Sequence, residues 1–343
     1  MQRARKILIV DDSKYMQQYL RDLIASDGRF QVSGTAGDPY EAVKIIAQEA
    51  PDLITLDIEM PRMSGLTFLK KIMRQHPIPV IIITSQNINQ IEAAMEALRE
   101  GAVELISKND ITPTDLEGRK NLLEKIWAAS NSKVTRLVYD RVMDTAAQTN
   151  YSRYNGSNKL ILIGASSGGT RTISEIITRL PAGIPPIVIV QHIPEQMSFL
   201  FARQLNQVCP FYVKEAEDDD LLVKNQVLIA PGNRHLELKQ TSYGLKTRIT
   251  HGPPVNHVRP SVDKLFFSAL PFASRDVIAI ILTGMGSDGA QGLLKLREKD
   301  AYTIAQDEKS AVIYGMPKVA WEMGAAKAVM NPAEIIRYLK QFI

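Results

Sequence analysis

The sequence has almost no cysteine, no long apolar run and no large excess of charge of one sign. Cys209 is the only cysteine in 343 residues, which excludes an internal disulfide framework and a cysteine-rich zinc site. No stretch approaches the ~20 apolar residues that span a bilayer, so we expect no membrane insertion. The formal net charge of +4 comes from mixed charges without a long basic block, which gives little reason to expect nucleic-acid binding.

The first residues resemble a secretory signal only in being basic. The apolar run that follows them, Ile7 to Val10, is too short for the hydrophobic region of a signal peptide and ends in two aspartates. We therefore expect the protein to be cytoplasmic.

The length of the chain predicts two domains, because single cores usually stop growing at ~250–300 residues. The expected domains are residues 1–127 and 158–343, joined by a linker at 128–157. Within the linker, the stretch Thr145 to Asn158 is rich in Thr, Asn, Ser, Gln and Tyr. Three valines before it have the spacing of one short helix: Val134, Val138 and Val142.

In the first domain, five β-rich runs alternate with segments that have helical spacing of apolar residues. The predicted strands are Lys6–Val10, Gln31–Ala36, Leu53–Leu56, Val80–Ile83 and Val103–Ile106. A last helix is predicted to open at Thr114, with Glu117 completing a capping box. This alternation predicts a flavodoxin-like (βα)5 fold, in which helices cover both faces of a parallel sheet.

The alternation of strands and helices restarts at Lys159 and predicts a second α/β domain, Rossmann-like and doubly wound. Around Leu228–Thr250 the pattern changes to short strands with turns, which predicts an antiparallel β-hairpin inserted in the sheet. The predicted helices of this domain are Ser174–Leu180, Phe199–Gln207 and Ala290–Arg297.

Acidic residues follow two of the strands expected in the first domain. Asp11 and Asp12 come directly after the first strand, and Asp57 follows the third. Because carboxyl ends of parallel strands meet at one edge, these carboxylates should lie close together, where Mg²⁺ would relieve their repulsion. Thr84 and Lys108, at the ends of the fourth and fifth strands, could then hold phosphoryl oxygens. The alternative is that these are only cap and turn residues, which five matched positions at strand ends make less favourable.

These motifs resemble those of the response-regulator receiver family. The matching segments are Ile7-Leu-Ile-Val-Asp-Asp12, Leu56-Asp57-Ile-Glu-Met-Pro61 with Gly65, Thr84-Ser85 and Lys108. The resemblance implies that a partner histidine kinase phosphorylates Asp57, and that Asp11, Asp12, Asp57 and the Glu59 carbonyl hold Mg²⁺. The chain departs from the family at Asn109, where proline is usual, and at Leu105, where an aromatic switch residue is frequent. We therefore expect no aromatic relay to the second domain.

Three apolar runs in the second domain lead to residues able to perform acyl transfer: Ser166, His192 and Asp288. Delivered to one edge of a parallel sheet, they could form a nucleophilic triad. The segment Gly164-x-Ser166-x-Gly168 fits a strand-to-helix turn that exposes a nucleophilic hydroxyl and offers free N–H groups to an oxyanion. The same turn could instead cradle a phosphate or allow close packing, and a lone histidine is more often a structural hydrogen bonder.

The second domain resembles the catalytic domain of the chemotaxis methylesterase (CheB) family. The matching segments are Ile163-Gly-Ala-Ser166-Ser-Gly-Gly169, Gln191-His192-Ile-Pro194, Ile229-Ala-Pro-Gly-Asn-Arg-His235, Arg259-Pro-Ser-Val-Asp263, Leu282-Thr-Gly-Met-Gly-Ser-Asp288-Gly-Ala290, Ala305-Gln-Asp-Glu308 and Tyr314-Gly-Met-Pro317. The resemblance implies that Ser166 is the nucleophile, His192 the general base and acid, and Asp288 the residue that orients it. It makes the Met285 N–H a candidate oxyanion donor, and no metal is required.

Some positions near this site leave alternatives open. Ser167 stands where the family commonly has threonine, which keeps a hydroxyl beside the nucleophile, and Val258 stands where histidine is frequent. His235 and Arg259 either shape the pocket or serve in packing and capping.

The two resemblances together imply a phosphorylation-controlled serine hydrolase. It would demethylate glutamate methyl esters on methyl-accepting chemoreceptors, with release of methanol, and deamidate glutamines there, with release of ammonia. Two rivals remain. One is a receiver-controlled signalling module whose second domain only binds a partner, and the other is an esterase with an unrelated substrate.

Overall fold

The computed structural model describes residues 3–85, 88–111, 115–132 and 159–343. The chain divides into two compact units, residues 1–139 and 140–343, each of which is described by itself. The short helix expected at Val134, Val138 and Val142, and most of the expected linker, lie outside the described residues. Among the described residues, no helix is both long and apolar enough to cross a bilayer.

The first unit contains a five-stranded sheet in the order β2-β1-β3-β4-β5, and every neighbouring pair is parallel. The strands are β1 (Arg5–Val10), β2 (Phe30–Ala36), β3 (Leu53–Leu56), β4 (Val80–Thr84) and β5 (Glu104–Ser107). All five predicted strands are confirmed, each to within one residue at either end. The order reverses between β1 and β3, the place where ligands bind in open α/β sheets.

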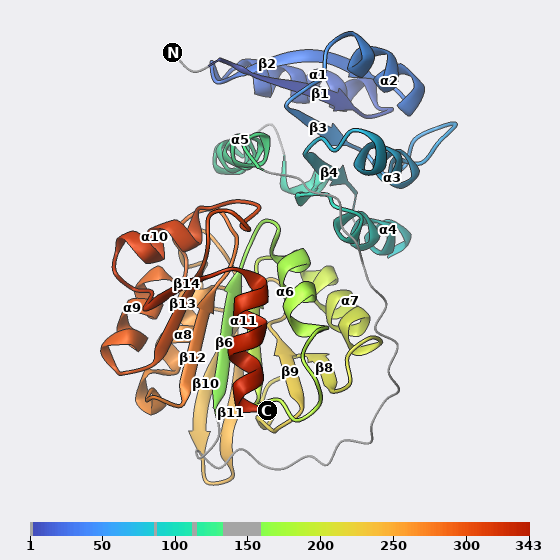
Figure 1. The fold of residues 1–343 in the computed structure, drawn as a ribbon. Helices are drawn as coiled ribbons and strands as arrows, with labels where there is room; N and C mark the ends of the chain where they lie inside the picture. Colours follow the sequence, from blue (N-terminus) through green and yellow to red (C-terminus); the bar gives the residue numbers. More distant parts are fainter. Residues whose placement is uncertain (1–2, 86–87, 112–114, 133–158) are drawn as a thin grey trace. The chain divides into compact units, whose positions relative to one another are not determined.

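Among the described residues, four α-helices connect these strands and a fifth follows β5, as the flavodoxin-like prediction requires. They are α1 (Lys14–Ala25), α2 (Pro39–Gln48), α3 (Gly65–Gln75), α4 (Ile88–Arg99) and α5 (Leu116–Ser130), and a short 3₁₀ helix, η1 (Lys108–Asp110), follows β5. Helix α1 packs beside α5, and α3 packs beside α4 (Figure 1). The apolar strand residues are therefore covered on both faces, and Ile7, Leu8 and Ile9 are fully buried.

The predicted start of α5 is wrong in detail. Thr114 lies outside the described residues, and the residue that caps the helix is Asp115. Its carboxylate accepts hydrogen bonds from the N–H groups of Glu117 and Gly118 at 3.1 and 2.9 Å, so one side chain satisfies two free helix donors. The helix continues to Ser130, past the boundary expected at residue 127.

The second unit contains a seven-stranded, fully parallel sheet in the order β14-β13-β12-β6-β7-β9-β8. The strands are β6 (Leu160–Ala165), β7 (Ile187–Gln191), β8 (Tyr212–Glu215), β9 (Gln226–Ile229), β12 (Val277–Ile281), β13 (Tyr302–Gln306) and β14 (Ala328–Met330). The chain moves from β6 to one side of the sheet, then returns to β12 on the other. The order therefore reverses between β6 and β12, as in the predicted doubly wound fold.

Helices cover both faces of this sheet (Figure 1). One face carries α6 (Gly169–Ile177), α7 (Glu195–Asn206) and α11 (Pro332–Leu339), and the other carries α8 (Val262–Ser268), α9 (Ala290–Glu298) and α10 (Met316–Glu322). Two short 3₁₀ helices complete the unit: η2 (Leu270–Phe272) and η3 (Lys340–Phe342). Helix α6 begins earlier than the predicted Ser174, because Gly168 turns the chain directly from β6 into the helix.

The predicted β-hairpin is present as β10 (His235–Thr241) and β11 (Gly244–Thr250). The predicted insertion in the α/β domain is confirmed, because the hairpin lies between β9 and β12 in the chain, although it does not pair with the main sheet. The hairpin forms a two-stranded sheet of its own and packs against α8, where Leu236 and Leu238 bury their side chains. Because α8 covers the apolar face of the hairpin, the hairpin does not need to pair with an edge strand of the main sheet.

Candidate active site and acidic site

The strand ends of the second unit bring the expected nucleophile and base to neighbouring places. Ala165 at the end of β6 pairs with Gln191 at the end of β7, and the His192 N–H donates to the Ala165 carbonyl at 3.0 Å. Ser166 and His192 thus follow directly after paired residues. Asp288 lies in the loop after β12, the other neighbour of β6. The site occupies the place where the strand order reverses.

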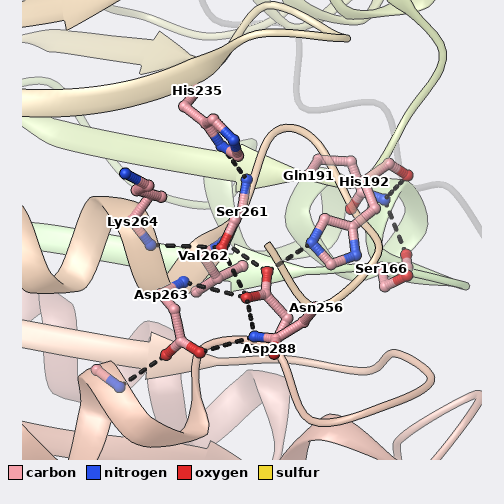
Figure 2. Close-up of polar contacts among 11 residues, drawn as sticks. Ser166, Gln191, His192, His235, Asn256, Ser261, Val262, Asp263, Lys264 and Asp288 are labelled. Atoms are coloured by element: carbon pink, nitrogen blue, oxygen red, sulfur yellow. Dashed lines mark hydrogen bonds and ion pairs between the residues drawn. The ribbon is translucent and has the colours of Figure 1, made fainter. Parts of the chain in front are cut away.

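His192 and Asp288 are joined by a hydrogen bond of 2.9 Å between Nε2 and Oδ2. Figure 2 shows the imidazole between Asp288 and Ser166. Because Nε2 faces the carboxylate, Nδ1 is the ring nitrogen that remains available, and its part as the base for Ser166 stays a prediction. Burial raises the pKa of the Asp288 carboxyl, but hydrogen bonds from His192, Asn256 and Ser261 outweigh it and hold the pKa below its ordinary value. The carboxylate is therefore ionised, as an orienting residue must be.

The start of α8 fixes the Asp288 carboxylate in place. The Val262 N–H donates to Oδ2 at 2.6 Å, and the hydroxyl of the N-cap residue Ser261 donates to Oδ1 at 2.7 Å. Asp263 adds its N–H at 3.3 Å. Sequence reasoning did not identify these partners of Asp288, although a serine before an apolar helical run is itself a recognisable N-cap signal.

Ser166 lies on the strand-to-helix turn predicted from its glycines. Gly168 has φ +75°, and a Cβ there would lie 2.5 Å from the Val312 Cβ. A Cβ at Gly169 would lie 2.1 Å from Gln191 Oε1, so both positions require glycine. The Ser166 N–H donates to the Thr283 carbonyl at 3.0 Å, which ties the turn to the loop after β12.

Gln191 holds the backbone that carries Ser166 and His192, a role that sequence reasoning missed. Its side chain is 2% exposed, and its Nε2 donates to the carbonyls of Ser166 and His192 at 2.8 and 3.0 Å (Figure 2). A single amide group therefore ties the Ser166 backbone to the His192 backbone. No periodicity marks this residue, because its position in a buried strand end is evident only from the fold.

The loop after β12 packs closely against Ser166. A Cβ at Gly284 would lie 2.6 Å from the Ser166 Cβ and 2.5 Å from Met316 Sδ. Met285, the next residue, is half-buried, and its N–H as an oxyanion donor stays a prediction. Ser167 is buried and its carbonyl accepts from Thr283 Oγ1 at 3.0 Å, while its part in the pocket also stays a prediction.

His235 and Arg259 have structural partners. His235 is fully buried; its Nδ1 accepts from the Ser261 N–H at 3.2 Å, and its Nε2 lies 2.9 Å from the Pro253 carbonyl. It thereby supports the segment that holds Asp288. The Arg259 guanidinium donates to Asn233 Oδ1 and to the Gly252 carbonyl. These contacts favour packing and capping over shaping of the pocket.

The acidic cluster predicted in the first unit is present. Asp11, Asp12 and Asp57 each offer a carboxylate oxygen, and these atoms all lie within 4.8 Å of one another. Lys108 Nζ lies 2.5 Å from Asp57 Oδ2 and 2.8 Å from Asp11 Oδ2. Burial raises the pKa of the Asp57 carboxyl, and the Lys108 ammonium opposes that shift.

A pocket of 540 Å³ lies next to the acidic cluster and is lined by Asp12, by Glu59 and its neighbours in the segment between β3 and α3, and by Ala93 of α4. The Asp57 side chain itself is buried. A Cβ at Gly65 would lie 1.9 Å from the Asp57 carbonyl, so only glycine allows α3 to begin there. Thr84 is buried at the end of β4. Clustered carboxylate oxygens are ligands that suit Mg²⁺, so the donor set fits the predicted ion.

A receiver-type acidic site on one sheet and a serine–histidine–aspartate set on another define a response regulator with a hydrolase domain. Comparisons with known proteins agree: residues 7–119 match the response regulator receiver domain model and residues 161–339 match the CheB methylesterase model. The chain belongs to the CheB methylesterase family.

Similar proteins span the whole chain. It is 42% identical to protein-glutamate methylesterase/protein-glutamine glutaminase 2 of Rhodospirillum rubrum, over 98% of this chain and 97% of that protein. Identity to the protein of the same name in Oleidesulfovibrio alaskensis is 42%, over 96% of each. The crystal structure of the Thermotoga maritima CheB methylesterase catalytic domain matches with a TM-score of 0.53 and 37% identity, covering 55% of this chain and 100% of that one.

Proposed function

We propose that the protein is a phosphorylation-controlled protein-glutamate methylesterase and protein-glutamine glutaminase that acts on methyl-accepting chemoreceptors. The observation that carries the proposal is the contact of His192 with a fixed Asp288 beside Ser166, in a chain similar along its whole length to proteins of that name. The hydrogen bonds around Asp288 hold one ionised carboxylate in a fixed position, and a domain that only binds a partner would not need this.

The reaction proceeds through an acyl-enzyme. Ser166 Oγ gives its proton to His192 Nδ1 and attacks the γ-carbonyl carbon of a glutamyl methyl ester. The C–O bond to methoxide then breaks, and His192 returns the proton so that methanol leaves. Water, deprotonated by His192, attacks the acyl-enzyme and restores Ser166 and a glutamate. A glutamine side chain follows the same route and releases ammonia.

Two groups stabilise charge during this reaction. The Asp288 carboxylate stabilises the imidazolium that forms on His192, through the bond at Nε2. The Met285 N–H is the proposed donor to the developing oxyanion, because Gly284 before it packs closely against Ser166. Loss of one such donor costs about 2.7–4 kcal/mol of transition-state stabilisation.

The first unit receives the controlling signal. A histidine kinase phosphorylates Asp57, while Lys108 and Thr84 contact the phosphoryl oxygens. Asp11, Asp12, Asp57 and the Glu59 carbonyl would hold Mg²⁺, which supplies positive charge for phosphoryl transfer. Leu105 and Asn109 occur where the family often has an aromatic residue and proline, so no aromatic relay is proposed. The protein would meet its kinase and its receptors in the cytoplasm, the compartment expected from the sequence.

The test is mass spectrometry of candidate receptors incubated with wild-type and Ser166→Ala protein. Loss of receptor methyl groups and glutamine amides with wild type alone supports the proposal. Unchanged methylation by both proteins, with unchanged partner binding, would favour a signalling module. Turnover of a generic ester by wild type without any effect on methylated receptor would favour an esterase with an unrelated substrate.

A further inference from the structure

The side-chain amide of Asn256 lies between two buried carboxylates. Its Nδ2 is 2.9 Å from Asp263 Oδ2 and 3.0 Å from Asp288 Oδ1 (Figure 2). Each aspartate is 3% exposed. Because an amide nitrogen carries two hydrogens, one Asn256 side chain can donate to both carboxylates at once.

Two neighbouring carboxylates in a buried place repel each other unless a donor or cation lies between them. Burial raises the pKa of Asp263, and the charge of Asp288 adds to this effect against the hydrogen bond from the Gly292 N–H. The titratable groups that face Asp288 are His192, from the segment after β7, and Asp263, from α8. Without the amide, the charge on Asp288 loses one of its donors and faces Asp263 directly.

The turn that carries Asn256 is built to hold its position. Val255 and Val258 exchange backbone hydrogen bonds of 3.1 and 3.0 Å, and the two residues between them have φ of +52° and +64°. Two left-handed central residues in a two-residue turn match the type I′ pattern, in which asparagine is favoured. The backbone of Asn256 is thus fixed while its side chain reaches inward to the carboxylates.

We propose that Asn256 is a positioning residue for the hydrolytic reaction: its amide bridges Asp263 and Asp288 and keeps Asp288 directed at His192 Nε2. The inference rests on the proposed function, because it assigns the residue a part in that chemistry. Asn256 contacts no reacting atom and acts only through Asp288.

Asn256→Asp is the informative substitution, because it keeps the shape and tolerates the left-handed backbone but replaces the bridging donor with a third carboxylate. Added negative charge stabilises the imidazolium. In an NMR titration whose ring signals are assigned with His192→Gln, the protonation of the His192 ring is expected at higher pH in Asn256→Asp than in wild type. The acidic limb of the pH profile of kcat/KM for receptor demethylation should move in the same direction. At neutral pH, kcat/KM should fall about tenfold, the effect of losing one hydrogen bond to a charged group.

Two further variants separate this role from a merely structural one. Asn256→Gly removes the amide without strain at positive φ and should give a smaller shift in the same direction. Asp263→Asn combined with Asn256→Asp restores the number of carboxylates, and the amide of residue 263 can donate to the carboxylate of residue 256. The double variant should recover part of the wild-type His192 titration and part of the activity lost in Asn256→Asp, whereas a structural role predicts additive damage.

The proposal is overturned if His192 titrates as in wild type in both folded single variants, or if the double variant is no better than Asn256→Asp alone. Thermal unfolding of each variant checks that it is folded. If Asn256→Asp does not fold, Asn256→Gly takes its place in the test. The NMR titration needs no substrate. Failure of wild type to demethylate receptors would therefore reject the proposed function while the bridge is still tested.

Discussion

The Asp288 carboxylate binds His192 at Nε2, 2.9 Å away, and leaves Nδ1 for Ser166. In the serine-protease triad the carboxylate binds Nδ1 and the serine is served by Nε2. The two arrangements are chemically equivalent, because a neutral imidazole has one donor and one acceptor nitrogen. The Asp288 carboxylate favours the tautomer with its hydrogen on Nε2, which leaves the lone pair on Nδ1, the nitrogen that we propose takes the Ser166 proton.

Asp288→Asn should therefore reduce kcat for receptor demethylation by ~10⁴-fold with little change in KM. The amide keeps the shape of the carboxylate but can donate to Nε2, which places the imidazole hydrogen on Nδ1. Steady-state kinetics with methylated receptor measure the effect. Asp276→Asn, at the opposite end of β12, is the matched control and should keep wild-type kcat. Equal kcat for Asp288→Asn and wild type would remove Asp288 from the mechanism.

The stability of the second unit should depend on pH through the same carboxyl. The pKa of Asp288 lies below its ordinary value of 3.8 in the folded protein, so its stabilising contribution is present above that value. The contribution is lost as the pH falls through the lower, folded pKa. Below about pH 4, the advantage of wild type over Asp288→Asn in unfolding temperature should shrink. Calorimetric scans between neutral pH and pH 3 test this, and an advantage that grows on acidification would contradict the sign.

Gln191→Glu should damage the site without touching a reacting group. An ionised carboxylate cannot donate to the Ser166 and His192 carbonyls, so both lose a partner in a buried place. We expect a loss of about 1–3 kcal/mol in the free energy of unfolding for a buried group left unsatisfied, and a lower kcat. Gln240→Glu, whose exposed amide also donates to a backbone carbonyl, is the control. Comparable losses in the two variants would show that Gln191 has no special role.

Gly284→Ala should lower kcat by moving the Met285 N–H away from Ser166. The added methyl group would lie 2.6 Å from the Ser166 Cβ, 3.0 Å from the Ser166 nitrogen and 2.5 Å from Met316 Sδ, which forces the loop outward. The loss should reach the ~10²-fold expected for one oxyanion donor. Gly252→Ala meets only the His235 ring at 3.7 Å and should keep its activity. A Gly284→Ala enzyme with wild-type kcat would argue against Met285 as the donor.

Residues at strand ends were predictable from the sequence, because a buried parallel strand is a continuous apolar run and its end is easily seen. Asp57, Ser166 and His192 all stand at such ends, and the structure places them as expected. Asp288 lies farther along its loop, and glycines on both sides of it gave the signal.

The residues that hold the site in position were not predictable in the same way. Asn256, Ser261 and Gln191 meet their partners through contacts between distant segments, for which no local pattern exists. The β-hairpin was predicted, but the element against which it packs was not, since the same alternating pattern suits the edge of the main sheet or the surface of a helix. The start of α5 was misplaced because Thr114 and Asp115 are both capping residues, and a carboxylate satisfies two donors.

Chelation of Mg²⁺ should affect phosphorylation at the acidic site but not hydrolysis at the Ser166 site. The cluster of possible metal ligands found among the described residues is Asp11, Asp12 and Asp57, so EDTA should abolish phosphorylation of Asp57 and the stimulation of demethylation that it causes.

Basal demethylation, without phosphorylation, should persist in EDTA and in Asp57→Ala. A change from a mostly inactive to a mostly active second domain requires ~5.5 kcal/mol of differential stability, more than we expect a single phosphoryl contact to supply, so the unphosphorylated protein should keep an active fraction. Methanol release assayed with and without kinase and EDTA measures both effects. If Asp57→Ala with an intact Ser166 showed no hydrolysis at any enzyme concentration, the control would be all-or-none and the expected basal activity would be wrong.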